Sequence, residues 1–171
     1  MLHKLLRWVK HRWADGAQHA LTAPALARIQ ARIAASEVQH SGEIRVCVEA
    51  GLPNSYLLRA APTPALLRQR AIALFGRLRV WDTEHNNGVL IYLCVAEHAI
   101  ELVADRGIDR HVSREQWSDI VQRLSVHLRA DQWEAGLNEA IDNVHGLLVQ
   151  HAPTHKGDTN PNELPDAPVV L

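Results

Sequence analysis

The chain has 171 residues, of which 47% are apolar and 22% charged, with 18 Lys and Arg against 19 Asp and Glu. This length suits one domain with a sizeable core, and the net charge of −1 excludes nucleic-acid binding driven by overall charge. The 11 His residues would make the net charge strongly positive below about pH 6.

The cysteine pattern and the hydropathy limit where the protein works. Cys47 and Cys94 each lie inside an apolar stretch and no CxxC motif occurs, which predicts two buried free thiols in a reducing compartment. No apolar run approaches the roughly 18 residues of a transmembrane helix. At the N-terminus, basic residues interrupt the apolar runs, which are too short for the hydrophobic region of a signal peptide. We therefore expect a cytoplasmic protein without a transmembrane segment.

The first segment, residues 1–22, is predicted to be a basic amphipathic helix followed by a linker. Within residues 2–13 the apolar side chains recur at helical spacing, and four Lys and Arg residues fill the other face. Two interpretations stay open. The helix contacts an anionic membrane surface or a protein partner, which would place the protein at the periphery of the inner membrane, or it packs against its own domain.

The residues that follow predict a helix, a strand and a second helix. Thr22 is expected to cap a helix that runs to about Ser36, with a proline in its first turn. Residues 43–49 alternate apolar and other side chains, as in a strand with one wetter face. Residues 51–62 are predicted to be a loop, after which Thr63 begins the second helix.

A polar stretch, residues 82–88, precedes the most apolar segment of the chain. Residues 89–95 are seven consecutive apolar residues rich in β-formers, which predicts a central strand covered on both faces. Glu97 and His98 are expected to form a hairpin tip, from which residues 99–104 return antiparallel.

Two further helices and a tail complete the chain. Ser113 with Gln116 fits a capping box at the start of one helix, and Asp131 with Glu134 fits a similar capping pair at the start of the next. Residues 152–171 are rich in Pro, Asn and Asp, which predicts an irregular tail whose last three residues alone could dock. This order predicts an α/β single domain, a three-layer α/β/α sandwich around a small mixed β-sheet.

Three short motifs resemble those of the TPM domain family. They are Gly42-Glu43-Ile44 at the start of the first strand, Asn87-Gly88 before the central strand, and Gly107 in the turn after the next strand. The similarity spans residues 23–151, which we treat as a TPM-like domain. The longer stretches VWDTEHNNGVL and VADRGI resemble a bacterial branch of the family whose members are mostly uncharacterised.

The resemblance implies the same α/β/α sandwich and leaves the chemistry open. The family is similar to a thylakoid-lumen acid phosphatase, a photosystem repair protein and a receptor-channel accessory protein. Some of its members are phosphatases or bind divalent cations, and others are accessory proteins of membrane complexes. The resemblance therefore implies either a metal-dependent hydrolase or an interaction module.

The polar loops on either side of the predicted hairpin are the candidate site. The start of one hairpin strand lies beside the end of the other, so residues 82–88 and 105–109 should converge, with Glu43 joining from its own strand. Carboxylate oxygens suit a hard cation such as Ca²⁺ or Mg²⁺. The candidate metal ligands are Asp82, Glu84, Asp105 and Asp109, and Arg106 is the candidate phosphate contact. His85 alone is a weak signal for zinc, and the remaining His residues, scattered singly, are predicted to lie on the surface.

The same residues also fit a purely structural role. Asp82, Asn87 and Gly88 are typical of a turn, and Asp105 with Arg106 of a surface ion pair beside a tight turn. No phosphate-cradling loop, nucleophile elbow or Cys–His pair is visible in the sequence. We therefore expect a non-enzymatic accessory or interaction module, associated with a membrane or a membrane-protein partner through the N-terminal helix, with a divalent-cation site as a secondary property. The alternative is a metal-dependent phosphatase acting on phosphomonoesters.

Overall fold

A computed structural model of the chain describes residues 7–11, 16–154 and 161–171. In chain order, after a helical segment at residues 7–11, the elements are α2 (Ala17–Ala20), α3 (Ala23–Glu37), β1 (Ile44–Glu49), α4 (Asn54–Leu57), α5 (Thr63–Arg77), β2 (Val89–Cys94), the 3₁₀ turn Val95–Glu97, β3 (Ala99–Ala104), α6 (Arg106–Asp109), α7 (Arg114–Arg129), α8 (Trp133–His151) and β4 (Val169–Val170). None of the helices in these ranges is both long and apolar enough to cross a membrane.

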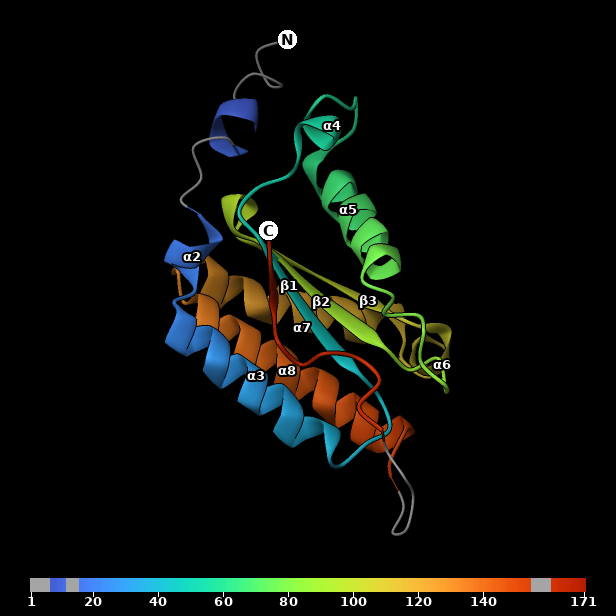
Figure 1. Cartoon of the computed structure of the whole chain (residues 1–171). Helices are drawn as coiled ribbons and strands as arrows, with labels where there is room; N and C mark the ends of the chain where they lie inside the picture. Colours follow the sequence, from blue (N-terminus) through green and yellow to red (C-terminus); the bar gives the residue numbers. More distant parts are fainter. Residues whose placement is uncertain (1–6, 12–15, 155–160) are drawn as a thin grey trace.

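The strands form one mixed sheet in the order β3-β2-β1-β4 (Figure 1). β1 and β2 run parallel, with Ile44 opposite Val89, because α5 carries the chain from the end of one to the start of the other. β3 pairs antiparallel with β2, with Ala104 opposite Val89, and β4 pairs parallel with β1 at the other edge. The predicted mixed sheet with a hairpin is confirmed.

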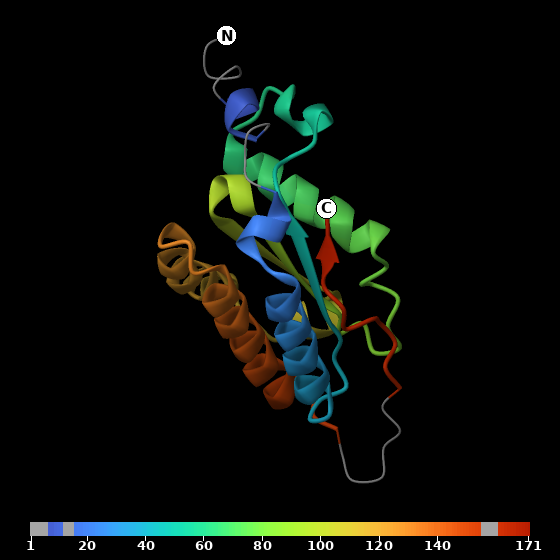
Figure 2. The same cartoon turned by 60° about the vertical axis from the view of Figure 1, so that its left-hand side comes forward.

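Helices cover both faces of this sheet. The apolar side chains of α3, α7 and α8 form one core with alternate residues of the strands, among them Val46 and Ile91. Those of α4 and α5 form a second core with the intervening residues, among them Cys47 and Tyr92. Figure 2 shows α5 on one side of the strands and α3 with α8 on the other. The α/β/α sandwich expected from the sequence is therefore the observed fold.

The strand β1 differs from the prediction, because all of its residues are buried and neither face is wet. Arg45 donates hydrogen bonds to the carbonyl oxygens of Pro165 and Ala167 in the tail. Glu49 accepts from Arg70 of α5 at 2.5 and 3.0 Å. Arg45 and Glu49, on the face predicted to be wet, are thus covered by the tail and α5 and paired there. The alternating pattern of one strand does not predict such partners.

Three local predictions are also corrected. The predicted loop 51–62 contains the short helix α4. The predicted hairpin tip is a 3₁₀ turn that already begins at Val95, and it ends at His98, whose φ of 49° is left-handed. Asp131 has a φ of 56° and does not cap α8, whose N-cap is Gln132 without a side-chain hydrogen bond. By contrast, the Thr22 cap and the Ser113–Gln116 capping box are confirmed.

The last residues of the tail dock on the sheet, as the sequence allowed, because Val169–Val170 forms β4. The Leu171 amide donates to the Val48 carbonyl at 2.9 Å, and the Ala50 amide donates to the Leu171 carbonyl at 3.2 Å. Upstream, the side chain of Glu43 accepts from the backbone amides of Glu163 and Leu164. The tail therefore covers the β1 edge of the sheet.

Candidate functional site

The two polar loops converge at one end of the sheet, as the hairpin geometry predicts. The Asp105 amide donates to the Gly88 carbonyl at 2.9 Å, and the Gly107 amide donates to the Asn86 carbonyl at 2.7 Å. Asn86 has a φ of 54°, a left-handed backbone conformation that asparagine tolerates better than most residues. The loops are thus held together backbone to backbone.

Gly88 and Gly107 are needed where the loops touch. A Cβ atom at Gly107 would lie 2.3 Å from the Asn86 carbonyl oxygen and 2.4 Å from that of His85. A Cβ atom at Gly88 would lie within 2.0 Å of the Val80 carbonyl oxygen. Because all three neighbours are backbone atoms, no side chain can move aside to make room. The two glycines of the motif therefore permit close backbone approach.

The four predicted metal ligands do not gather into one carboxylate cluster. Asp82 forms an ion pair with Arg79, three residues earlier, and Glu84 lies on the exposed surface of the loop. Asp105 caps α6 by accepting from the Arg106 amide at 2.7 Å, and the side chains of Asp109 and Arg106 are exposed. Within the described ranges, no group of three or more His, Cys, Asp or Glu residues is placed to hold a metal ion.

Two oxygen atoms in the converging loops nevertheless lack a hydrogen-bond partner. The Asn87 side chain donates from Nδ2 to the Ser41 carbonyl and hydroxyl, and its own amide donates to the Thr83 hydroxyl. Its Oδ1 and the Oδ2 of Asp105 are both buried and unpaired among the described residues. A buried oxygen without a donor is costly, so both atoms are candidates for a water molecule or a cation.

Glu43 does not join these loops through its side chain, although its backbone carbonyl accepts from the Val89 amide at 2.8 Å. Its carboxyl group faces the tail, where it lies near Glu37 and Asp166 along a cavity of about 300 Å³. Glu37 accepts from the Ile44 amide at 2.8 Å. Burial raises the pKa of Glu37 to about 8 and that of Glu43 to about 7, against the opposing effect of the amides that donate to them.

Two histidines predicted to lie on the surface are buried, His11 and His40. His40 Nε2 lies 2.8 Å from the Ser36 hydroxyl, which lies 2.9 Å from Nδ1 of His145, and His40 Nδ1 lies 2.9 Å from the Gly42 carbonyl oxygen. Since that carbonyl only accepts, Nδ1 of His40 carries a proton and Nε2 accepts from Ser36. Burial lowers the pKa of His40 to about 4, which keeps it neutral.

The described part of the N-terminal helix, residues 7–11, packs against its own domain. Arg7 donates to the carbonyl oxygens of Leu57, Arg59 and Ala61, and Trp8 donates to the Asn54 side chain. Lys10 and His11 both bind the Glu97 carboxylate, at 2.8 and 2.7 Å. The rest of the predicted helix, residues 2–6 and 12–13, lies outside the described residues.

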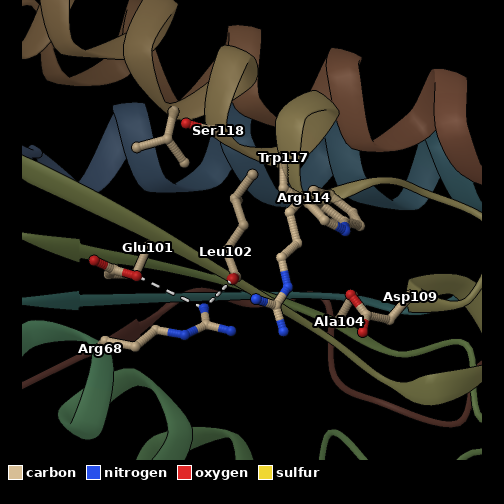
Figure 3. A pocket seen from close by; sticks show the side chains of 9 residues that line it. Arg68, Glu101, Leu102, Ala104, Asp109, Arg114, Trp117 and Ser118 are labelled. Carbon is tan, nitrogen blue, oxygen red and sulfur yellow. Dashed lines mark hydrogen bonds and ion pairs between the residues drawn. The ribbon is translucent and has the colours of Figure 1, made fainter. Parts of the chain in front are cut away.

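A cavity larger than the one beside Glu43 lies next to the converging loops and includes Asp109 in its wall. It is a groove of about 540 Å³ along β3, between α5 and the start of α7 (Figure 3). Its walls carry Arg68, Glu101, Asp109, Arg114, Trp117 and Ser118. Two basic residues in unrelated helices give no signal in the sequence, because only the fold brings α5 and α7 to the same strand.

Comparisons with known proteins agree with this architecture. The sequence model of the TPM domain family matches residues 15–147. A solved structure, the NMR structure of BA42 protein from the psychrophilic bacterium Bizionia argentinensis sp. nov., is 27% identical, with a TM-score of 0.71 over 87% of this chain and 94% of that chain. The search of curated proteins finds no match. Because the family model spans well over half of the sequence and the fold agrees, this chain belongs to the TPM domain family.

Proposed function

We propose that the protein is a non-enzymatic accessory module that associates with a membrane or a membrane-protein partner. Its contact region is the N-terminal surface, which we define as Trp8, Val9 and Leu58 together with Arg7 and Arg59. The observation that carries the proposal is the exposure of these apolar side chains in one place: Trp8 is 37% exposed, Val9 42% and Leu58 72%.

The contacts of Arg7 make this surface continuous. Arg7 binds the carbonyl oxygens of Leu57 and Arg59, the residues on either side of Leu58, so the helical segment and the loop after α4 lie together. Large apolar side chains scattered singly need no explanation, but several together beside basic groups are typical of a docking surface. The N-terminal surface has this composition.

The charge of the N-terminal surface suits an anionic partner. Arg7 binds only carbonyl oxygens, and Arg59 binds the Ser55 carbonyl and the Gln69 side chain while its guanidinium lies 3.9 Å from the centre of the Tyr56 ring. Neither arginine forms an ion pair with any described residue, so no described carboxylate neutralises the positive charge of this surface, which favours lipid phosphates or acidic side chains nearby.

Co-sedimentation tests the proposal with two kinds of vesicle. The protein should sediment with phosphatidylglycerol vesicles or, if its partner is a protein, only with bacterial inner-membrane vesicles. The double variant Val9→Ser and Leu58→Ser should weaken sedimentation about tenfold, because two apolar side chains no longer leave water. Val126→Ser, at a 66% exposed position on α7, is the matched control and should bind as the parent does. Binding to neither vesicle would contradict the proposal.

Divalent-cation binding in the converging loops is a second proposal, and the unpaired oxygens of Asn87 and Asp105 favour it. Amide and carboxylate oxygens are the ligands that Ca²⁺ and Mg²⁺ prefer, and loop carbonyl groups commonly complete such sites. Added Ca²⁺ or Mg²⁺ at about 100 times its dissociation constant should stabilise the chelator-treated protein by about 2.7 kcal/mol. Thermal unfolding measures this shift.

Two variants and one assay separate the outcomes of the cation experiment. Asp105→Asn should abolish the thermal shift, whereas Asp142→Asn, which removes the exposed partner of Arg32 on α8, should leave the shift unchanged. The absence of any shift would leave a structural role for the loops. Turnover of p-nitrophenyl phosphate by the cation-loaded protein, lost in Asp105→Asn, would favour the phosphatase alternative over an accessory module.

A further inference from the structure

The strand β3 forms an edge of the sheet, and part of its backbone faces outward. Among the described residues, β3 pairs with β2 and with no other strand. The Asp105 amide bonds across to Gly88, and in an antiparallel pair the bonding direction alternates, so Leu102 and Ala104 direct their amide and carbonyl groups away from β2. The Leu102 carbonyl confirms this, because it accepts from Arg68 of α5 at 2.5 Å.

The groove of about 540 Å³ runs along these outward groups. Leu102 and Ala104 line it, and its wall on α7 includes the apolar surfaces of Trp117 and Val121. Such an edge, with an apolar wall beside unpaired backbone groups, has the features that accept an added strand. Nothing in the described part of the chain occupies the groove.

Two arginines enter the groove from the two helical layers. Arg68 reaches it from α5 and Arg114 from the start of α7, and Figure 3 shows both guanidinium groups directed into the same space. Arg68 forms an ion pair with the Glu101 carboxylate at 3.6 Å, in addition to its hydrogen bond to the Leu102 carbonyl. Arg114 has no hydrogen bond or ion pair with any described residue. Glu101 and Asp109 also line the groove, so Arg114 is the arginine there that no described carboxylate pairs with, and its free charge favours an added anion beside it.

Besides Arg114, a second donor in the groove lacks an acceptor. Nε1 of Trp117 is shielded from solvent and has no hydrogen-bond partner among the described residues. An indole N–H can only donate, so it requires an oxygen from outside. The groove thus presents donors from Arg68, Arg114 and Trp117 together with an open strand edge.

We propose that the β3 groove binds an extended, acidic segment of a partner protein, which adds to the sheet beside β3. Its backbone pairs with the outward groups of Leu102 and Ala104, and a Glu or Asp side chain lies between Arg68 and Arg114. Arg68 leaves the Leu102 carbonyl for that carboxylate, which frees the carbonyl for a backbone amide of the partner. The molecule already uses this mode at its other edge, where the tail adds β4 to β1.

This inference does not depend on the N-terminal surface, which involves none of the same residues. It adds a second contact, for a protein segment, to the membrane or partner contact of the proposed function. Either can fail without the other: Val9→Ser and Leu58→Ser leave the groove intact, and variants at Arg114 leave the N-terminal surface intact.

Titration with synthetic peptides, followed by amide NMR shifts, tests the proposal. The probe is a peptide of about seven residues that alternates Val with Glu, the length of an ordinary strand. It should shift the amide signals of residues 100–104 and bind about tenfold more weakly to Arg114→Ala. Arg129→Ala removes the same charge from the other end of α7 and should bind as the parent does. Because Arg114 is exposed and unpaired, its variant should also unfold at the parent temperature.

Two further peptides separate strand addition from simple anion binding. A peptide with Lys in place of Glu should not bind, and neither should the Glu peptide with N-methylated backbone amides. No shift of residues 100–104 with the Glu peptide, or equal binding of the Lys peptide, would overturn the proposal. Equal binding of the N-methylated peptide would overturn strand addition and leave only an anion site.

Discussion

Glu37 and Glu43 place two buried carboxyl groups where the chain enters β1. Both accept hydrogen bonds from backbone amides, Glu37 from β1 itself and Glu43 from the tail. These bonds favour the charged forms, but burial has the larger effect and raises both pKa values. At the residue scale, therefore, the start of β1 binds protons more tightly in the folded than in the unfolded chain.

This proton binding predicts how stability depends on pH. Between the ordinary Glu pKa of about 4.3 and the folded values of about 7 and 8, the folded state holds more protons, so stability should fall as pH rises through this window. Glu37→Gln keeps the acceptor oxygen and removes the titration, so urea unfolding between about pH 6.5 and 8.5 should show a smaller decline. His40 acts in the opposite direction, but below about pH 6.5, outside the range compared. An unchanged decline would contradict this prediction.

The glycines of the converging loops allow a matched pair of substitutions. Gly107→Ala should destabilise the protein by about 2 kcal/mol, because the added Cβ would meet two backbone carbonyl oxygens. Gly146→Ala should instead stabilise it by about 1 kcal/mol, since Gly146 lies inside α8 with nothing within 4 Å of an added Cβ. Denaturant unfolding measures both changes. A Gly107→Ala protein as stable as the parent would show that the loops can separate at no cost.

At the scale of elements, β4 shows how a segment distant in sequence completes a strand that is already formed. Only two residues pair with β1, but Arg45 and Glu43 hold the preceding tail by its backbone. These hydrogen bonds are made to the backbone of the tail and require no particular tail side chain. The hydropathy pattern of residues 161–171 therefore does not predict that the tail binds β1. The tail covers the β1 edge, whereas no strand of the described residues pairs with the β3 edge.

Removal of β4 should therefore expose one edge locally. Deletion of residues 169–171 takes away the acceptor of the Ala50 amide, so hydrogen exchange at Ala50 should become faster. The Val89 amide, bonded to the Glu43 carbonyl inside the sheet, is the internal control and should keep its protection. Equal acceleration at both amides would mean that β4 supports the whole sheet and does not merely cover its edge.

For the whole molecule, the two cysteines report global opening. Cys47 and Cys94 lie on adjacent strands beneath α5, fully buried, and burial raises the pKa of each thiol to about 12. A thiol reagent should therefore label neither of them in the native protein at neutral pH, because it needs an exposed thiolate. Labelling followed over time in rising urea should occur at the rate of unfolding. Rapid labelling in the absence of urea would reveal local opening between α5 and the sheet.

Much of the fold was predictable because it depends on local patterns. Thr22 and Ser113 cap their helices as expected, and the apolar run at residues 89–95 contains the central strand. The convergence of residues 82–88 with 105–109 also follows, because a hairpin necessarily brings those ends together. The cap by Asp131 failed because that residue adopts a left-handed turn that ends α7, which a spacing rule does not detect.

The sequence by itself determined the kinds of element, their order and the family, because caps, apolar periodicity and turn residues act over a few neighbouring positions. Tertiary structure alone decided that Glu43 binds the tail, that His40 is buried against Ser36, and that Arg68 and Arg114 share the groove along β3. The physical reason is distance along the chain. Hydrogen bonds and charges between residues far apart in sequence exist only once the sheet and its two helical layers have brought those residues together.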